Sequence, residues 1–352
     1  MTRNRGLRKK LKPFQFRPIT IRWFHNLFPL LVIGLAVHLL LPQLANLEQA
    51  WQTVSQMPEG IVALAFIAQI VSYIGSGYLL QSLTVLVQER LSILFGIAIT
   101  LAGNSMGLVT GGIVGNGAAI YHWLAARNIS KEAAGLCSTM PSLFNNILLM
   151  LIAIAGLLHL LVIHQLPRLQ AIGFGVILGV LIFLLVGGIW GVNHPEKLLA
   201  VVTPFAKRWA RLWKRPYSSA GTENDVNQLV NIWIVLGHGG WLHPLVGTIL
   251  SIAFDMMTLF FLFVATGHSV SLGILLTGYG LPLIVGKVGF LPGGVGIVET
   301  TMTAIYVSLG VPSHIAVVVI LVYRLISFWI PTLMGFPLVL YFQQMTRNRI
   351  RT

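Results

Sequence analysis

The sequence predicts an all-α protein, a polytopic membrane helical bundle with about eight transmembrane segments, including two broken or re-entrant hairpins. Hydrophobic residues make up 56% of the 352-residue chain and charged residues only 9%, whereas about a quarter of the residues of a soluble domain are charged. Apolar runs repeatedly reach the roughly 20 residues with which a helix crosses hydrocarbon. Two further apolar runs are interrupted midway by glycine. Together these features point to lipid as the main solvent of the chain.

The basic residues are concentrated beside the apolar runs. The formal net charge is +14, and Lys and Arg cluster in residues 3–22, 197–215 and 347–351. Such clusters mark cytoplasmic loops and attract anionic lipid headgroups. We therefore expect a protein of the cell membrane with both termini in the cytoplasm. The expected partner is an anionic lipid, with homo-oligomerisation left open, and not nucleic acid, because the basic stretches lack a recognition fold.

The apolar runs divide the chain into a basic N-terminal segment, residues 1–24, and one transmembrane domain, residues 25–345. The first run follows a basic stretch without a small-residue cleavage site, so it is read as an uncleaved span. Full spans are predicted near residues 27–46, 61–87, 133–163, 169–190, 241–266 and 315–342. The single cysteine, Cys137, excludes an internal disulfide.

The predicted hairpins are residues 91–126 and 271–311. The first contains glycines from Gly103 to Gly112, and the second contains Gly286 and the sequence Pro292-Gly293-Gly294. Non-helical backbone at membrane depth survives only where it is buried in protein or lines a wet cavity. These breaks are therefore candidate cavity linings, and each hairpin either re-enters or spans twice.

The charged loops place the two hairpins on opposite faces of the membrane. Each hairpin is flanked by a span on either side, which gives two repeats of opposite topology at about residues 61–163 and 241–342. Inverted repeats with interrupted helices are typical of secondary transporters, with the substrate site near the midplane. Between them, residues 191–227 are predicted to be a cytoplasmic linker that contains a basic amphipathic helix.

Enzyme signatures are scarce. The ten histidines form no HExxH pattern, and the sequence has neither a nucleophile elbow nor a Walker loop. No catalytic residue, metal site or cofactor is predicted.

Four charged residues stand inside apolar stretches: Asp255, Lys287, Glu299 and Arg324. Four charges at mid-bilayer cost roughly 10 kcal/mol on the mild insertion scale, so they need partners or a role. One interpretation is a polar cavity in which Arg324 or Lys287 holds an anion while Glu299 and Asp255 balance charge. The other is a set of buried ion pairs that only locks helices together.

Several neighbours of these charges are further candidate site residues. The guanidinium of Arg324 can hold a phosphate through two hydrogen bonds, and a helix that starts near Gly296 would add backbone amides toward the same anion. Tyr323 and Trp329 could flank the anion. Asn104 and Asn116 give the first repeat a polar, uncharged interior.

The run Leu291-Pro292-Gly293-Gly294-Val295-Gly296-Ile297-Val298-Glu299, followed by Tyr323-Arg324 and Pro331, resembles the lysylphosphatidylglycerol synthase transmembrane family. The resemblance covers residues 25–345 and implies a flippase-like fold that moves lipids between leaflets. The first repeat departs from the family pattern, because Thr110, Asn116, Ala119, Ser142 and Leu143 stand where members often carry Pro or charged residues. The departure argues against the same headgroup and against a charge relay through both repeats.

The functional hypothesis is a lipid translocase, with Arg324 and Lys287 binding the phosphate of the headgroup. Three alternatives remain open. They are a transporter of a small soluble anion, a membrane-embedded helper or enzyme of polyprenyl, hopanoid or glycan lipid biosynthesis, and an interaction subunit.

Overall fold

The computed structural model describes residue 52 and residues 54–350, apart from 111, 164–165, 213–239 and 289–291. Throughout these residues the regular structure is helical, with no strand. Six helical segments are long and apolar enough to cross a membrane: Glu59–Val85, Ile93–Thr110, Lys131–Ile163, Arg168–Gly191, Leu242–Ala265 and Ser313–Arg347. The all-helical, multi-span prediction is confirmed at this level.

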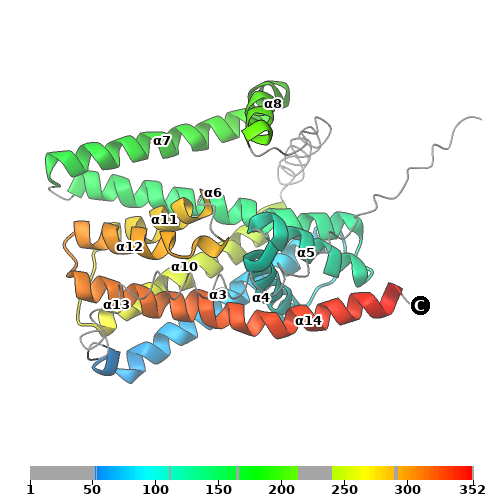
Figure 1. Ribbon diagram of the computed structural model, residues 1–352, viewed down its shortest axis with the longest axis horizontal. Helices are drawn as coiled ribbons and strands as arrows, with labels where there is room; N and C mark the ends of the chain where they lie inside the picture. The colour runs from blue at the N-terminus through cyan, green and yellow to red at the C-terminus, as the bar shows by residue number, and fades with distance from the viewer. Residues whose placement is uncertain are drawn as a thin grey trace, which may run out of the picture.

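The first half of the chain contains α3 (Glu59–Val85), α4 (Ile93–Thr110), α5 (Ile113–Ala126), α6 (Lys131–Ile163), α7 (Arg168–Asn193) and α8 (Pro195–Leu212). The second half contains α10 (Leu242–Ala265), α11 (Leu272–Val288), the short 3-10 helix η3 (Pro292–Gly294), α12 (Ile297–Ser308), α13 (Ser313–Arg324), the π-helical segment η4 (Leu325–Trp329) and α14 (Ile330–Ile350). Figure 1 shows these helices running largely side by side.

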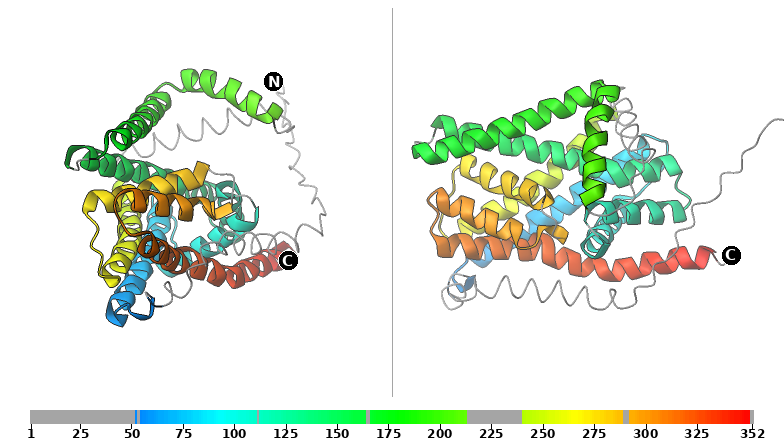
Figure 2. Two further views of the ribbon diagram at one scale, coloured as in Figure 1. Left: turned by 60° about the vertical axis from the view of Figure 1, so that its left-hand side comes forward. Right: turned by 45° about the horizontal axis from the view of Figure 1, so that its top comes forward.

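Five of the six predicted full spans lie in α3, α6, α7, α10 and the continuous run from α13 to α14. The predicted span 27–46 and the basic segment 1–24 lie outside the described residues. In the linker, α8 follows α7 at a sharp angle (Figure 2), and residues 213–227 are not among those described. Proline is favoured in the first turn of a helix, which fits Pro195 as the first residue of α8.

Each predicted hairpin is a pair of helices joined at a glycine turn, and each turn lies at the C-terminal end of the glycine-rich stretch that the sequence indicated. The helix α4 continues through Gly103 and Gly107 to Thr110, and the chain turns at Gly112, whose φ is 73°. Likewise Gly286 lies inside α11. A glycine within a helix costs only about 1 kcal/mol, and Gly103 lets α4 approach Asn116 and Ile120 of α5 closely.

The two halves pack in a reciprocal way. The first helices of the halves, α3 and α10, pack along each other, and a Cβ on Gly75 would collide with the backbone of Ser251. The span that follows each hairpin packs on the first helix of the other hairpin, so α6 contacts α11 and α14 contacts α4. Gly156 of α6 and Gly335 of α14 give these two contacts their close approach.

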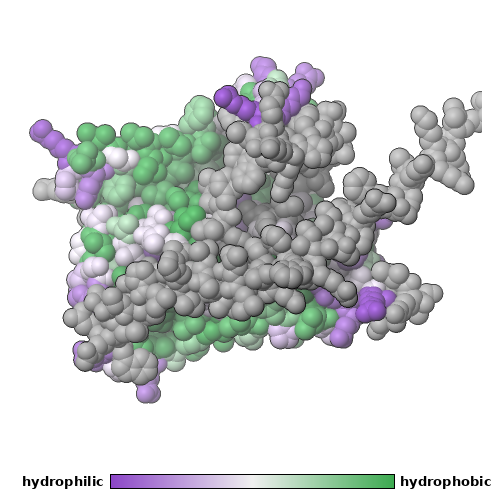
Figure 3. All heavy atoms as spheres, viewed as in Figure 1, coloured by the Kyte–Doolittle hydropathy of each residue, from purple (hydrophilic) through white to green (hydrophobic). Residues whose placement is uncertain are grey.

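The outer surface matches a lipid environment. Large apolar side chains of α7, such as Leu169 (84% exposed) and Phe183 (75% exposed), face outward from the bundle. Figure 3 shows hydrophobic residues along the sides of the bundle and hydrophilic residues at its two ends and on α8. The helix ends therefore lie where water and headgroups would meet the protein.

Candidate functional site

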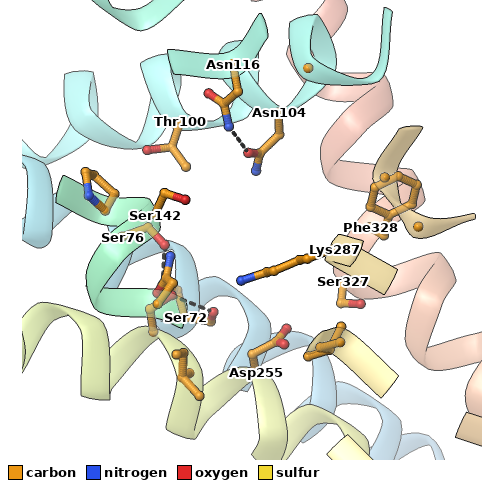
Figure 4. A pocket seen from close by; sticks show the side chains of 18 of the residues that line it. Ser72, Ser76, Thr100, Asn104, Asn116, Ser142, Asp255, Lys287, Ser327 and Phe328 are labelled. Carbon is orange, nitrogen blue, oxygen red and sulfur yellow. Dashed lines mark hydrogen bonds between the residues drawn. The ribbon is translucent and has the colours of Figure 1, made fainter. Parts of the chain in front are cut away.

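A cavity of about 740 Å³ lies between the two halves. Helices of both halves contribute to its wall, and Figure 4 shows polar side chains pointing into it from several sides. Its polar lining consists mainly of Gln69, Ser72, Tyr73, Ser76, Thr100, Asn104, Asn116, Ser138, Ser142, Asn145, Ser251, Asp255, Tyr279, Lys287, Arg324, Ser327 and Thr332. A polar cavity inside an apolar bundle is the default candidate for a binding site.

Arg324 and Glu299 form a buried ion pair at one wall of this cavity. Arg324 Nε donates to Glu299 Oε1 at 2.7 Å, and the two residues are only 6% and 4% exposed. The chain brings them together because η3 and the turn after it direct α12 back toward α13. Each charge therefore has its counter-charge at hydrogen-bonding distance, which offsets the cost of burying both.

The same pair holds the glycine turn of the second hairpin. Arg324 Nη2 donates to the carbonyl of Gly293 at 3.2 Å, and Glu299 Oε2 accepts the backbone N–H of Gly296 at 2.7 Å. Gly293 has a φ of 68°, in the left-handed region that favours glycine. The ring of Phe328 lies under the guanidinium, 4.2 Å from its carbon, in a cation–π contact. The side chains of Arg324 and Glu299 thus hold the turn together, and Phe328 of η4 packs against the guanidinium.

Asp255 is held by two tyrosines. Its Oδ2 accepts the hydroxyls of Tyr279 and Tyr323, each at 2.7 Å. Both rings are almost fully buried, at 2% and 1% exposed. Both hydroxyls donate to the same oxygen of the carboxyl group, so Asp255 serves as an acceptor at the cavity wall.

Lys287 differs from the other charges in its surroundings. It lies in the last turn of α11, is exposed, and extends across the cavity between Asp255 and the pair Asn104 and Asn116 (Figure 4). Its Nζ donates to Asn146 Oδ1 at 2.6 Å. No carboxylate of the described residues lies within ion-pair distance of this ammonium. Lys287 therefore presents a cation to whatever occupies the cavity.

The part of the cavity wall formed by the first half is polar but uncharged. Asn116 Nδ2 donates to Asn104 Oδ1 at 3.1 Å, while Asn116 Oδ1 is buried without a partner among the described residues. Ser76 and Ser251 share a hydrogen bond of 2.9 Å across the contact between α3 and α10. Amides and hydroxyls both donate and accept, so this wall suits a neutral hydrogen-bonding group.

The structure brings the predicted residues together in three groups. Arg324, Glu299, Gly293 and Gly296 form the buried clamp, Asp255 meets Tyr323, and Asn104 meets Asn116. Gly294 lines the cavity beside Gly293. The backbone of Pro292 begins η3, and its side chain is outside the described part of the chain. Glu299 and Tyr323 contact lining residues and do not line the cavity themselves.

Sequence reasoning missed the contribution of α3. Its cavity-lining residues Gln69, Ser72, Tyr73 and Ser76 follow the spacing of one helical face. That polar stripe in an otherwise apolar run was the signal that could have found them.

Phe328, and not Trp329, provides the ring next to Arg324. Within the described residues, no three His, Cys, Asp or Glu side chains gather as they would around a metal ion.

Comparisons with known proteins give one family. The model of the lysylphosphatidylglycerol synthase TM region matches residues 29–335. A UPF0104 membrane protein of Pyrococcus horikoshii is 30% identical over 145 residues, which are 41% of this chain and 37% of that protein. Two UPF0104 membrane proteins of Methanothermobacter thermautotrophicus are 35% and 32% identical over 88 residues, or 25% of this chain and 26% of each relative. The chain thus matches well under two thirds of the length of these relatives.

Proposed function

The chain belongs to the lysylphosphatidylglycerol synthase TM-region family, and we propose that it is a flippase-like translocase that moves a phospholipid or related anionic lipid between leaflets. One observation carries the proposal. The ammonium of Lys287 lies in a polar cavity between the two halves, bonds to the neutral amide of Asn146, and has no carboxylate partner among the described residues. A cation placed there at a cost of about 2.5 to 3.5 kcal/mol calls for an anion.

The other charges are already matched within the protein. Arg324 commits Nε and Nη2 to Glu299 and Gly293, and Asp255 accepts two tyrosine hydroxyls. We therefore assign the lipid phosphate to Lys287. Arg324 acts as a positioning residue that fixes the turn at one wall of the site.

We further propose that the two halves are inverted repeats that exchange access to the cavity. Support comes from the reciprocal packing, in which α6 contacts α11 and α14 contacts α4. In such transporters the site lies at the repeat interface, and one part rocks against the other. The headgroup would cross through the polar cavity while the acyl chains stay in lipid along the apolar outer surface. The placement of both termini in the cytoplasm, at the cell membrane, remains part of this proposal.

Leaflet exchange in vesicles tests the proposal. Purified protein is reconstituted with fluorescent phospholipids of several headgroups, and a membrane-impermeant quencher reports how much label reaches the outer leaflet with time. We expect exchange of anionic phospholipids above that of protein-free vesicles. Lys287→Met should slow it about 10- to 100-fold, the effect of losing one charge-assisted hydrogen bond.

Lys131→Met is the matched control, because Lys131 is exposed at the start of α6 and does not line the cavity. This variant should exchange lipid like the parent protein. Equal rates for Lys287→Met and the parent would refute the assignment of Lys287. Exchange no faster than in empty vesicles, for every headgroup, would refute the translocase and favour a transporter of a small soluble anion or a biosynthetic helper.

A further inference from the structure

Resting on the proposed function, we infer that the ligand of this cavity is a phosphate ester with an uncharged, hydroxyl-rich headgroup, such as glycerol or a sugar, and not a cationic headgroup. The wall of the cavity has two chemically different parts. Lys287 supplies the cation, and the neutral side chains of α3, α4 and α5 supply mixed donors and acceptors. The ligand should carry groups that complement both.

The paired amides of Asn104 and Asn116 favour hydroxyls over ionic groups. One hydrogen bond joins them, and whichever way the two amides are turned, a carbonyl oxygen and several N–H donors remain unused. Phosphate offers only acceptors and an ammonium offers only donors. A hydroxyl offers both, so a polyol can satisfy the two kinds of group at once.

Two buried acceptors without partners strengthen this reading. Gln69, which is 6% exposed, lines the cavity, and its Oε1 has no hydrogen-bond partner among the described residues. The same holds for Asn116 Oδ1. A buried acceptor left unpaired is costly. Both oxygens have almost no accessible surface, and Asn116 Oδ1 packs against Gly103, so a ligand hydroxyl recovers that cost when the amide turns toward the cavity. The two atoms lie on different helices, α3 and α5, which suits a headgroup with more than one hydroxyl.

The acidic groups argue against a cationic headgroup. Asp255 is the only acidic residue among the described lining residues, and it already accepts two tyrosine hydroxyls. Glu299 is committed to Arg324 and to the backbone of Gly296. A headgroup amine would also face the like charge of Lys287. An amine in the cavity would therefore be repelled by Lys287, and the carboxyl group of Asp255 already holds two hydroxyl donors on Oδ2.

The test compares lipids that differ only in hydroxyls. Phosphatidylglycerol and phosphatidylpropanol carry the same single charge, but the propanol headgroup has no hydroxyl. Leaflet exchange and lipid binding to the detergent-solubilised protein are measured for both, for aminoacylated phosphatidylglycerol, and for soluble glycerol phosphate. A site built to bond hydroxyls rejects an analogue that lacks them, so we expect phosphatidylglycerol to be preferred at least about tenfold in both assays.

The double variant Asn104→Leu/Asn116→Leu should reduce that preference toward one. Asn193→Leu, at the exposed end of α7, should keep it. Equal exchange and binding of the two lipids by the parent protein, or preference for the aminoacylated lipid, would overturn the inference and leave the translocase standing. Selective phosphatidylglycerol binding without exchange would support the ligand class and overturn the translocase. Uptake of glycerol phosphate without lipid exchange would support the same chemistry in a soluble ligand.

Discussion

The turn between α11 and α12 and the turn between α4 and α5 hold corresponding places in the two halves, yet different forces stabilise them. In the turn between α11 and α12, Arg324 and Glu299 bond to each other and to the backbone of Gly293 and Gly296. At the turn between α4 and α5, a hydrogen bond from Asn116 to Asn104 joins the two helices next to the turn. The α11–α12 hairpin is thus held by a buried ion pair, here called the charged clamp, and the α4–α5 hairpin by a hydrogen bond between neutral amides, here called the neutral latch.

This difference predicts which hairpin moves. Charge-assisted hydrogen bonds are about twice as strong as neutral ones, and removing one partner of a buried ion pair costs about 3 to 5 kcal/mol. A neutral hydrogen bond contributes only about 0.5 to 1.5 kcal/mol. If access to the cavity alternates, the α4–α5 hairpin should open while the α11–α12 hairpin serves as the fixed wall.

The largest effect should follow from breaking the charged clamp. Glu299→Gln leaves the Arg324 guanidinium buried without a counter-charge, so we expect the free energy of unfolding to fall by about 3 to 5 kcal/mol. Denaturant titration of the protein in detergent, followed by the fluorescence of its tryptophans, measures this loss.

The double variant Glu299→Gln/Arg324→Gln tests the cause. Without either charge, the buried cost disappears and part of the stability should return. A double variant as unstable as Glu299→Gln would show that the clamp acts through shape and not through charge, and the contrast between the two hairpins would lose its basis.

An intermediate effect should distinguish the two turn glycines. Gly112, with φ 73° and ψ −134°, has no atom within 4 Å of a Cβ position, so Gly112→Ala should cost about 1 to 3 kcal/mol from backbone strain alone. A Cβ on Gly293 would in addition collide with the ring of Phe328. In a Phe328→Ala background the cost of Gly293→Ala should therefore fall, whereas that of Gly112→Ala should not. Equal costs of Gly293→Ala in both backgrounds would place the strain in the backbone of both turns.

The spans and the charged residues of the cavity region could be predicted from the sequence, whereas the pairing of the charges could not. The spans stood out by length and hydropathy, and Asp255, Lys287, Glu299 and Arg324 stood out because a charge in an apolar run is expensive. Which charges would meet was not predictable. Glu299 and Arg324 are 25 residues apart in the chain and pair through the path of η3 and α12.

Neutral features were harder to find. Serine and glutamine cost far less than a charge inside a membrane helix, so Gln69, Ser72 and Ser76 on α3 did not stand out from ordinary helix-packing residues. The sequence placed each break only within a glycine-rich stretch and not at one residue. Glycine is tolerated within a helix, and only the backbone angles at Gly112 and Gly293 mark where the chain turns.

The smallest effect on stability should come from the neutral latch. Asn116→Leu removes one neutral hydrogen bond, worth about 0.5 to 1.5 kcal/mol, and also removes the buried carbonyl that has no partner among the described residues. The two changes oppose each other, so the free energy of unfolding should stay within about 1 kcal/mol of the parent value.

Hydrogen–deuterium exchange should nevertheless be faster at the α4–α5 turn than at the α11–α12 turn in the parent protein. Equal exchange at the two turns would mean that the Asn104–Asn116 hydrogen bond is no weaker than the Arg324–Glu299 pair. Slower exchange at the α4–α5 turn would reverse the assignment of the moving hairpin.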